Sequence, residues 1–179
     1  MQVQEETKKA GLSKNTIIII AVIAVLLPAV VILAVLNRAE MTERLTYHVE
    51  GSFRVISGEE YSHVSLEDLV NMSPANVSSS PRGERRDFTG VSLADILEFS
   101  GLDYSYATSI MFISIDGFRT AISLAEALNA ENAFIVFEED GVALGERPDL
   151  FSEAPFMLVM AQDPFPNRWA RYVFEIILQ

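Results

Sequence analysis

A long apolar run near the N-terminus restricts the fold of this chain more than any other feature. From Ile17 to Leu36, twenty consecutive residues include no charged side chain. A helix of this length, rising about 1.5 Å per residue, covers roughly 30 Å, the thickness of the hydrocarbon core of a bilayer. A cleaved signal peptide has a shorter apolar core of about 7–15 residues and a small-residue cleavage site, which the residues around Leu36 do not supply. The run therefore predicts an uncleaved transmembrane helix over residues 16–37.

The basic residues on either side of this run favour one orientation. Three lysines precede the run, whereas two arginines, Arg38 and Arg44, follow it closely. Because cytoplasmic flanks are enriched in lysine and arginine, this small excess favours a cytoplasmic N-terminus. We expect a cytoplasmic tail over 1–15, the membrane helix over 16–37, a juxtamembrane connector over 38–44 and a globular domain over 45–179. That domain would lie outside the cytoplasm at the cell membrane.

The part of the chain after the apolar run is strongly acidic. Residues 37–179 contain ten arginines, no lysine and 23 acidic residues, which gives a formal charge of −13. Such a surface repels nucleic acid and anionic lipid headgroups, so we expect no nucleic-acid partner. The chain also has no cysteine, which excludes disulfides, thiolate metal ligands and thiol catalysis.

Apolar periodicity and turn residues predict a domain of strands with short helices between them. Ser65, Ser92 and Ser123 each stand three residues before an acid, the arrangement of a helix capping box. Gly101 is placed to end the second of these helices, and Asp140-Gly141 is a typical type I′ hairpin turn. The predicted strands cover 45–49, 53–56, 109–115, 118–122, 133–137, 155–160 and 169–178, and a surface loop is expected over 71–88. This pattern predicts an α+β fold with a mixed sheet.

Four motifs in the domain follow one another in a distinctive order. A Gly-Val step, Gly90-Val91, leads into the Ser92 helix, and an Asp-Gly-Phe turn follows at 116–118. An Asp-Gly hairpin with a downstream leucine covers 140–144, and a basic-aromatic strand begins at Arg168. In this order of motifs, the chain from 45 to 178 resembles the molybdopterin-binding domain of the sulfite oxidase family. The resemblance implies the mixed β-sheet of that domain and a molybdopterin cofactor whose molybdenum is held by a cysteine thiolate.

The absence of cysteine separates this chain from the catalytic members of that family. No side chain here can supply the thiolate ligand, so we expect no bound cofactor and no catalytic residue. We interpret the domain as a non-catalytic relative that binds a small anionic ligand or a partner protein. The alternative is a molybdopterin-dependent oxidoreductase component that binds the cofactor without a cysteine, for which Ser78, Ser79 or Ser80 could supply an oxygen ligand. A third interpretation is an anchored structural subunit that recruits another protein through an edge strand or its acidic surface.

The candidate ligand-binding residues are three arginines and an Asp-Gly-Phe turn. Arg82, Arg85 and Arg86 cluster near the place where the family's cysteine would lie, and guanidinium groups bind phosphate and carboxylate in bidentate fashion. The same arginines could instead pair with Asp87 and neighbouring acids. Asp116 and Phe118 could contact a ligand. Alternatively, Asp116 forms the turn and Phe118 belongs to the core.

Other polar residues have simpler interpretations. His48 and His63 match no metal-binding signature, so we expect no metal site. The acids at 138–140 predict a solvated turn, and Arg168-Trp169 allows either a cation–π contact or packing of the ring at the core edge. Asn71 and Asn76 each begin an N-glycosylation sequon, which is relevant only if the domain is exported to a glycosylating compartment.

Overall fold

The structure, a computed structural model, describes residues 14–46, 50–147 and 154–179. It divides into two units, Met1–Glu43 and Arg44–Gln179. The helix α1 (Lys14–Thr46) includes Pro28, and its segment Lys14–Leu36 is long and apolar enough to cross a membrane. The helix continues through 38–44, predicted as a connector, and through Leu45 and Thr46, predicted to begin a strand. Alanine, glutamate, methionine and leucine in this stretch favour helix, and no glycine or proline stops it. The rest of that predicted strand, 47–49, lies outside the described residues.

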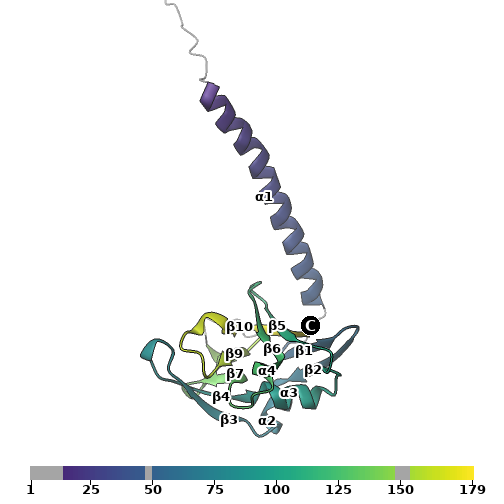
Figure 1. Ribbon diagram of the computed structural model, residues 1–179, viewed down its shortest axis with the longest axis vertical. Coiled ribbons are helices and arrows are strands. Elements are labelled where there is room, and N and C mark those ends of the chain that lie inside the picture. Colours follow the sequence, from purple (N-terminus) through teal and green to yellow (C-terminus); the bar gives the residue numbers. More distant parts are fainter. Residues whose placement is uncertain (1–13, 47–49, 148–153) are drawn as a thin grey trace, which may run out of the picture. The chain divides into compact units, whose positions relative to one another are not determined.

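The second unit contains strands and short helices (Figure 1). Its α-helices are α2 (Leu66–Asn71), α3 (Leu93–Ser100) and α4 (Leu124–Ala127). Its 3-10 turns are η1 (Pro81–Gly83), η2 (Leu144–Glu146) and η3 (Pro166–Arg168). Its strands are β1 (Ser52–Ser57), β2 (Glu60–Ser65), β3 (Ala75–Ser79), β4 (Arg86–Ser92), β5 (Ser109–Ser114), β6 (Arg119–Ser123), β7 (Ala133–Glu139), β8 (Val142–Ala143), β9 (Met157–Met160), β10 (Ala170–Arg171) and β11 (Val173–Leu178).

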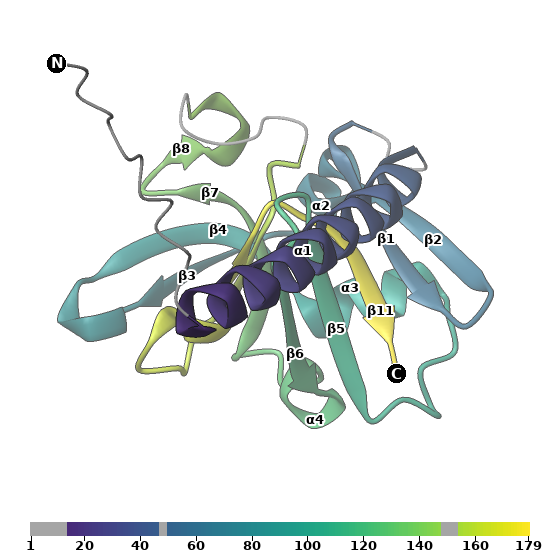
Figure 2. The ribbon, with the colours of Figure 1, turned by 90° about the horizontal axis from the view of Figure 1, so that it is seen from above.

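The strands form two sheets, which confirms the α+β prediction at the level of class. The five-stranded sheet has the order β2-β1-β11-β5-β6, and the six-stranded sheet has the order β10-β9-β7-β4-β3 with β8 paired to β7. Figure 2 shows the strands of the first sheet grouped on one side of the domain and β3, β4, β7 and β8 on the other. The β1–β11 pair is parallel, whereas the described pairs of the six-stranded sheet are antiparallel. Only the first sheet is therefore mixed.

The main core lies between the sheets and under α3. It contains buried residues of both sheets, among them Phe53, Phe112, Ile135 and Leu158. Phe53 meets Phe156 edge to face at 5.0 Å between ring centroids, a favoured aromatic geometry. The run Ala133–Phe137 shows no polar alternation because β7 is buried on both faces. Its other face packs in a second cluster, which consists of Val77, Phe88, Phe134, Val136, Leu144, Met157 and Val159.

The three predicted serine caps are confirmed. Each serine side chain accepts a hydrogen bond from the backbone N–H three residues later, and the capping box is complete at Ser65 and Ser123. At all three caps the serine hydroxyl also donates to the acid, at Ser92 to Asp95 Oδ2 at 2.6 Å. Gly101 ends α3 in the left-handed region with φ 67°, as a C-terminal glycine does. Asp140 and Gly141 both have positive φ, as a type I′ turn requires.

The Gly-Val step has a packing role that the sequence did not show. Gly90 lies at an irregularity in the β4–β7 register. A Cβ atom there would lie 2.5 Å from the carbonyl oxygen of Ile135 and 2.6 Å from Val136 Cα. Both contacts are with backbone that cannot move aside, so β4 approaches β7 this closely only with glycine.

Three predictions about strands are corrected. The stretch 71–88 is not a surface loop but contains β3, η1 and the start of β4, because Val77 and Phe88 face each other across a hairpin whose serines conceal the strand pattern. β2 was not predicted; it pairs along its whole length with β1. The last strand is interrupted at Tyr172, whose φ is 59°. A register shift also falls between Val173 and Glu175, so side chains do not alternate simply along 169–178.

Candidate functional site

The structure places the three predicted arginines in different surroundings. Arg82 lies in η1, is exposed and has φ 56°. Arg85 is 71% exposed and donates from Nε and Nη2 to Asp87 Oδ1, each at 3.1 Å. Arg86 Nη1 donates to Glu139 Oε1 at 3.1 Å. Two of the three guanidinium groups therefore bind carboxylates of the chain itself, and binding of an external anion stays a prediction.

The Asp87 carboxylate is a solvated partner for Arg85. Ser78 Oγ donates to Asp87 Oδ1 at 2.5 Å. This hydrogen bond, and next the one from Arg85, lower the pKa of Asp87 below its ordinary value. The cluster keeps its charge at neutral pH, and its exposure makes the ion pair weak.

Asp116 and Phe118 lie on the other sheet, in the turn between β5 and β6. Asp116 Oδ1 accepts a hydrogen bond from the backbone N–H of Phe118 at 2.9 Å, and Gly117 has φ 87°. Asp116 therefore stabilises the turn as an Asx residue. Phe118 is 42% exposed, so its interpretation as a core residue is wrong. The arginines belong instead to the β3–β4 hairpin of the six-stranded sheet, so the two groups lie on different sheets.

The acids at 138–140 do not form a solvated turn throughout. The side chain of Glu139 is 4% exposed and lies between two arginines. Arg86 binds its Oε1, and Arg147 Nη1 donates to its Oε2 at 2.8 Å. Arg147 Nη2 also donates to the Glu139 carbonyl oxygen at 3.3 Å. Glu139 is thus a buried structural carboxylate that joins β4, β7 and the residue after η2.

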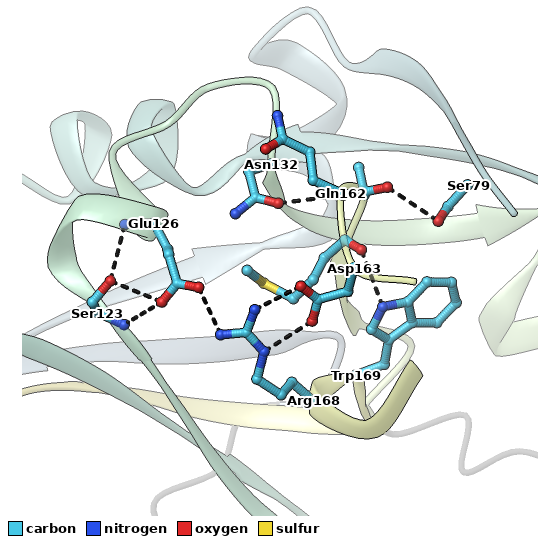
Figure 3. Close-up of polar contacts among 10 residues, drawn as sticks. Ser79, Ser123, Glu126, Asn132, Gln162, Asp163, Arg168 and Trp169 are labelled. Atoms are coloured by element: carbon cyan, nitrogen blue, oxygen red, sulfur yellow. Dashed lines mark hydrogen bonds and ion pairs between the residues drawn. The ribbon is translucent and has the colours of Figure 1, made fainter. Parts of the chain in front are cut away.

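A second ion cluster surrounds Arg168 (Figure 3). Its Nε and Nη2 donate to the two oxygens of Asp163 at 2.8 and 2.6 Å, and its Nη1 donates to Glu126 Oε1 at 2.7 Å. The hydrogen bonds that Arg168 donates to Asp163, and next the one to Glu126, raise the pKa of Arg168 above its ordinary value. The pKa of Glu126 is lowered to about 2, chiefly by the hydrogen bond from the backbone N–H of Ser123 and next by the one from Arg168. The Arg168 guanidinium therefore binds carboxylates. Trp169 packs edge to face against Phe88, with 5.5 Å between the ring centroids.

Further hydrogen bonds fix the loop between β9 and η3. Trp169 Nε1 donates to the Met160 carbonyl oxygen at 3.3 Å. Asn132 is buried, and its carbonyl and amide oxygens accept from the backbone N–H groups of Ala161 and Gln162 at 2.7 and 3.3 Å. Ser79 Oγ donates to the Ala161 carbonyl oxygen at 3.3 Å. Figure 3 shows these contacts converging on one loop, which is thereby held against β3 and β7.

The loop forms one wall of an open groove of about 420 Å³, which we call the β3 groove. Its apolar lining comes from Ala75, Val77, Val91, Ala130, Phe134 and Ala161, and its polar lining from Ser73, Asn76, Ser78, Ser92, Asp95 and Glu131. The only charged side chains in this lining are the two acids, Asp95 and Glu131. Ser78, considered above as an oxygen ligand, lines the groove, whereas the predicted ligand contacts Arg82, Arg85, Arg86, Asp116 and Phe118 do not. The sequence signals nearest to it are the Ser92 cap and the Asn76 sequon, neither of which indicates a groove.

Histidines and acids do not converge on a metal site within the described residues. No group of three or more histidine, cysteine, aspartate or glutamate side chains there could hold a metal ion. His63 is exposed and meets Tyr61 edge to face at 5.5 Å, and His48 lies outside the described residues.

The residues present do not fit a molybdopterin cofactor as the sulfite oxidase family holds it. The chain has no cysteine, and Arg85 and Arg86, predicted as anion contacts, are paired with its own acids. Of the serines considered as oxygen ligands, Ser78 donates to Asp87 and Ser79 is buried against Ala161.

Comparison with known proteins agrees with the fold. No family model and no curated protein sequence matches the chain. Among solved structures, the sulfane dehydrogenase SoxCD from Paracoccus pantotrophus aligns with a TM-score of 0.56 at 13% sequence identity. The alignment covers 71% of this chain and 37% of that chain, so this chain spans little more than a third of that structure's length. This similarity concerns the fold alone, and it supports the distant molybdopterin-oxidoreductase-like architecture that the ordered motifs predicted.

Proposed function

We propose that this chain is a single-pass membrane protein whose acidic domain lies outside the cytoplasm and binds a partner protein without catalysing a reaction. The observation that carries the proposal is the β3 groove. Its lining is half apolar and offers no imidazole, ammonium or guanidinium group. A lining of apolar and polar side chains suits recognition, whereas acid–base or nucleophilic catalysis needs a matched pair of groups.

The charges of the domain favour a protein partner over a small anionic ligand. The groove presents Asp95 and Glu131, and negative side chains repel an anion. Arg85 and Arg86 are each bound to an acid of the chain, so an anion would have to displace that acid. The sulfite-oxidase-like fold is in this proposal a scaffold that holds the groove.

Membrane topology can be tested because the chain contains no cysteine. Full-length protein should sediment with membranes and resist extraction by carbonate and high salt. In intact cells, a membrane-impermeant maleimide should label Ala125→Cys on the exposed surface of α4. It should label Gln2→Cys only after lysis. If only Gln2→Cys is labelled in intact cells, the orientation is the opposite of the one proposed. Recovery of the full-length protein in the soluble fraction would refute the membrane anchor.

Binding can be tested with the full-length protein in its own membranes. Crosslinking followed by purification should recover a defined partner, and Ala130→Trp, which fills the groove, should abolish its recovery. Ala125→Trp is the matched control, since Ala125 is exposed on α4 and does not line the groove. Protein expressed with molybdopterin supply should contain no stoichiometric molybdenum. One molybdenum per chain would favour the oxidoreductase alternative and refute the non-catalytic proposal.

A further inference from the structure

The six-stranded sheet ends at β3, and this strand has none of the charged or proline residues that usually protect an exposed edge. Within residues 50–147 and 154–179, β3 pairs with β4 alone. An unpaired edge presents free N–H and C=O groups, which natural proteins shield with lysine, proline, inward charges, bulges or very short strands. The five residues of β3, Ala-Asn-Val-Ser-Ser, include no charge and no proline. Figure 1 shows β3 at the rim of the domain with β4 as its neighbour.

The other sheet edges of the described domain differ from β3 in this respect. β2 begins with Glu60, and β6 begins with Arg119. β10 is only two residues long. Each of these edges therefore has either a charge or a short length that disfavours pairing with another chain. β3 is the edge best suited to accept an additional strand.

The β3 groove would receive side chains from such a strand. Along β3, Val77 and Ser79 are buried, whereas Asn76 and Ser78 are exposed. A strand aligned with β3 alternates its side chains in the same way, so every second one would face the groove. Phe134 and Ala161 supply an apolar wall for these side chains.

The acidic side chains around the groove favour a positively charged occupant. Asp95 and Glu131 line the groove and are exposed, and residues 37–179 carry a formal charge of −13. A second copy of this domain would bring the same negative charge to the edge and be repelled. Lysine or arginine side chains of a different protein would be attracted instead.

We propose that the β3 groove accepts an extended, basic segment of a partner protein, which joins the six-stranded sheet as a strand beside β3. The inference rests on the proposed function, because it names the chemistry of the partner for the same groove. Main-chain hydrogen bonds to β3 supply affinity in this mode of binding, and the groove and its acids supply specificity.

The first experiment uses full-length protein in detergent and a short capped peptide of alternating lysine and valine. The peptide should bind with an affinity that falls from low to high salt, since exposed ion pairs are screened. A peptide of alternating glutamate and valine should not bind. An N-methylated lysine–valine peptide keeps its charge but loses backbone donors, so it should bind at least about tenfold more weakly. Equal binding of the methylated peptide would overturn strand addition.

Two matched charge reversals locate the contact. Glu131→Lys should lower the affinity for the lysine–valine peptide by about tenfold, because like charges then meet at the groove. Glu98→Lys makes the same change on the exposed surface of α3, outside the groove. It should alter binding by less than about twofold, since a separated surface charge is largely screened. Equal losses in both variants would reduce the interaction to overall charge and refute the groove.

Hydrogen exchange distinguishes a paired strand from loose attachment. The peptide should slow exchange of outward-facing β3 amides and leave β2 and β6 amides unchanged. Binding without protection of β3, or concentration-dependent dimers that protect β3 without peptide, would overturn the inference. Suppose that wild type, but not Ala130→Trp, recovers a partner from membranes, and that the lysine–valine peptide does not bind. This outcome would refute only the basic-strand chemistry. Failure of both would refute the proposed function.

Discussion

Two ion clusters in the domain use three charged groups in opposite arrangements. In the six-stranded sheet, one carboxylate, Glu139, lies between Arg86 and Arg147. Beside α4, one guanidinium, Arg168, lies between Glu126 and Asp163. The distances between the charged nitrogen and oxygen atoms are similar in the two clusters, between 2.6 and 3.1 Å.

The clusters differ in how well the shared group is shielded from water. The Glu139 side chain is 4% exposed, whereas the Arg168 side chain is 35% exposed. A buried charge that loses its partners cannot recover solvation, whereas a partly exposed one can. Burial of the central group, more than the number of ion pairs, therefore sets the cost of breaking a cluster. Neither sequence neighbourhood showed this difference, because the burial of each central group depends on residues distant in the chain.

The largest effect is expected when Glu139 loses both arginines. Arg86→Met combined with Arg147→Met should lower the free energy of unfolding by about 3–5 kcal/mol, because the carboxylate stays buried and unpaired. Denaturation can be followed by the fluorescence of Trp169, the single tryptophan, which packs against Phe88. Adding Glu139→Leu should restore most of the lost stability. A loss below about 1 kcal/mol would show that water reaches Glu139.

Arg168→Met should have a smaller effect, a loss of roughly 1–2 kcal/mol, although it removes three hydrogen bonds. Its partners Glu126 and Asp163 are 34% and 17% exposed, so both can regain water. The same denaturation measurement compares the two clusters directly. A loss equal to that of the double arginine variant would show that burial of the central group does not set the cost of breaking a cluster.

The pH dependence of stability should reveal Glu126. Its folded pKa of about 2 lies below its ordinary value of 4.5, so its contribution is present above pH 4.5 and lost as the pH falls toward 2. The melting temperature of the wild type should therefore fall more steeply over this range than that of Glu126→Gln. Arg168→Met should keep part of the slope, because the Ser123 backbone N–H is the first cause of the lowered pKa. Parallel curves for wild type and Glu126→Gln would contradict this assignment.

The smallest effect is expected for the exposed arginines of the β3–β4 hairpin. Arg82→Ala and Arg85→Ala should each change the free energy of unfolding by less than about 0.5 kcal/mol, as surface ion pairs contribute little. Arg85 is 71% exposed beside an Asp87 that is 57% exposed. A larger loss in either variant would show that the hairpin contributes to stability through its charges.

Local features of the fold could be predicted because neighbouring residues determine them. A serine cap depends on a hydroxyl and an amide three residues apart, so Ser65, Ser92 and Ser123 were found correctly. The Asp140-Gly141 turn depends on two residues that tolerate positive φ. The region 71–88 was missed because its strands carry serine, arginine and aspartate, and only pairing with β4 and β7 makes strands of them. Phe118 is exposed because its turn projects beyond the paired strands, which its hydrophobicity could not indicate.

The amino-acid sequence is enough to predict a membrane-length apolar helix, the acidic charge of the rest, the absence of any thiolate and the local turns and caps. Each follows from composition or from contacts within a few residues. The burial of Glu139 between Arg86 and Arg147, and the ion pairs of Arg168 with Glu126 and Asp163, arise only when the chain folds. Folding also places β3 at the end of a sheet, beside a groove. These features join residues distant in the chain, and burial and pairing depend on what the fold brings together.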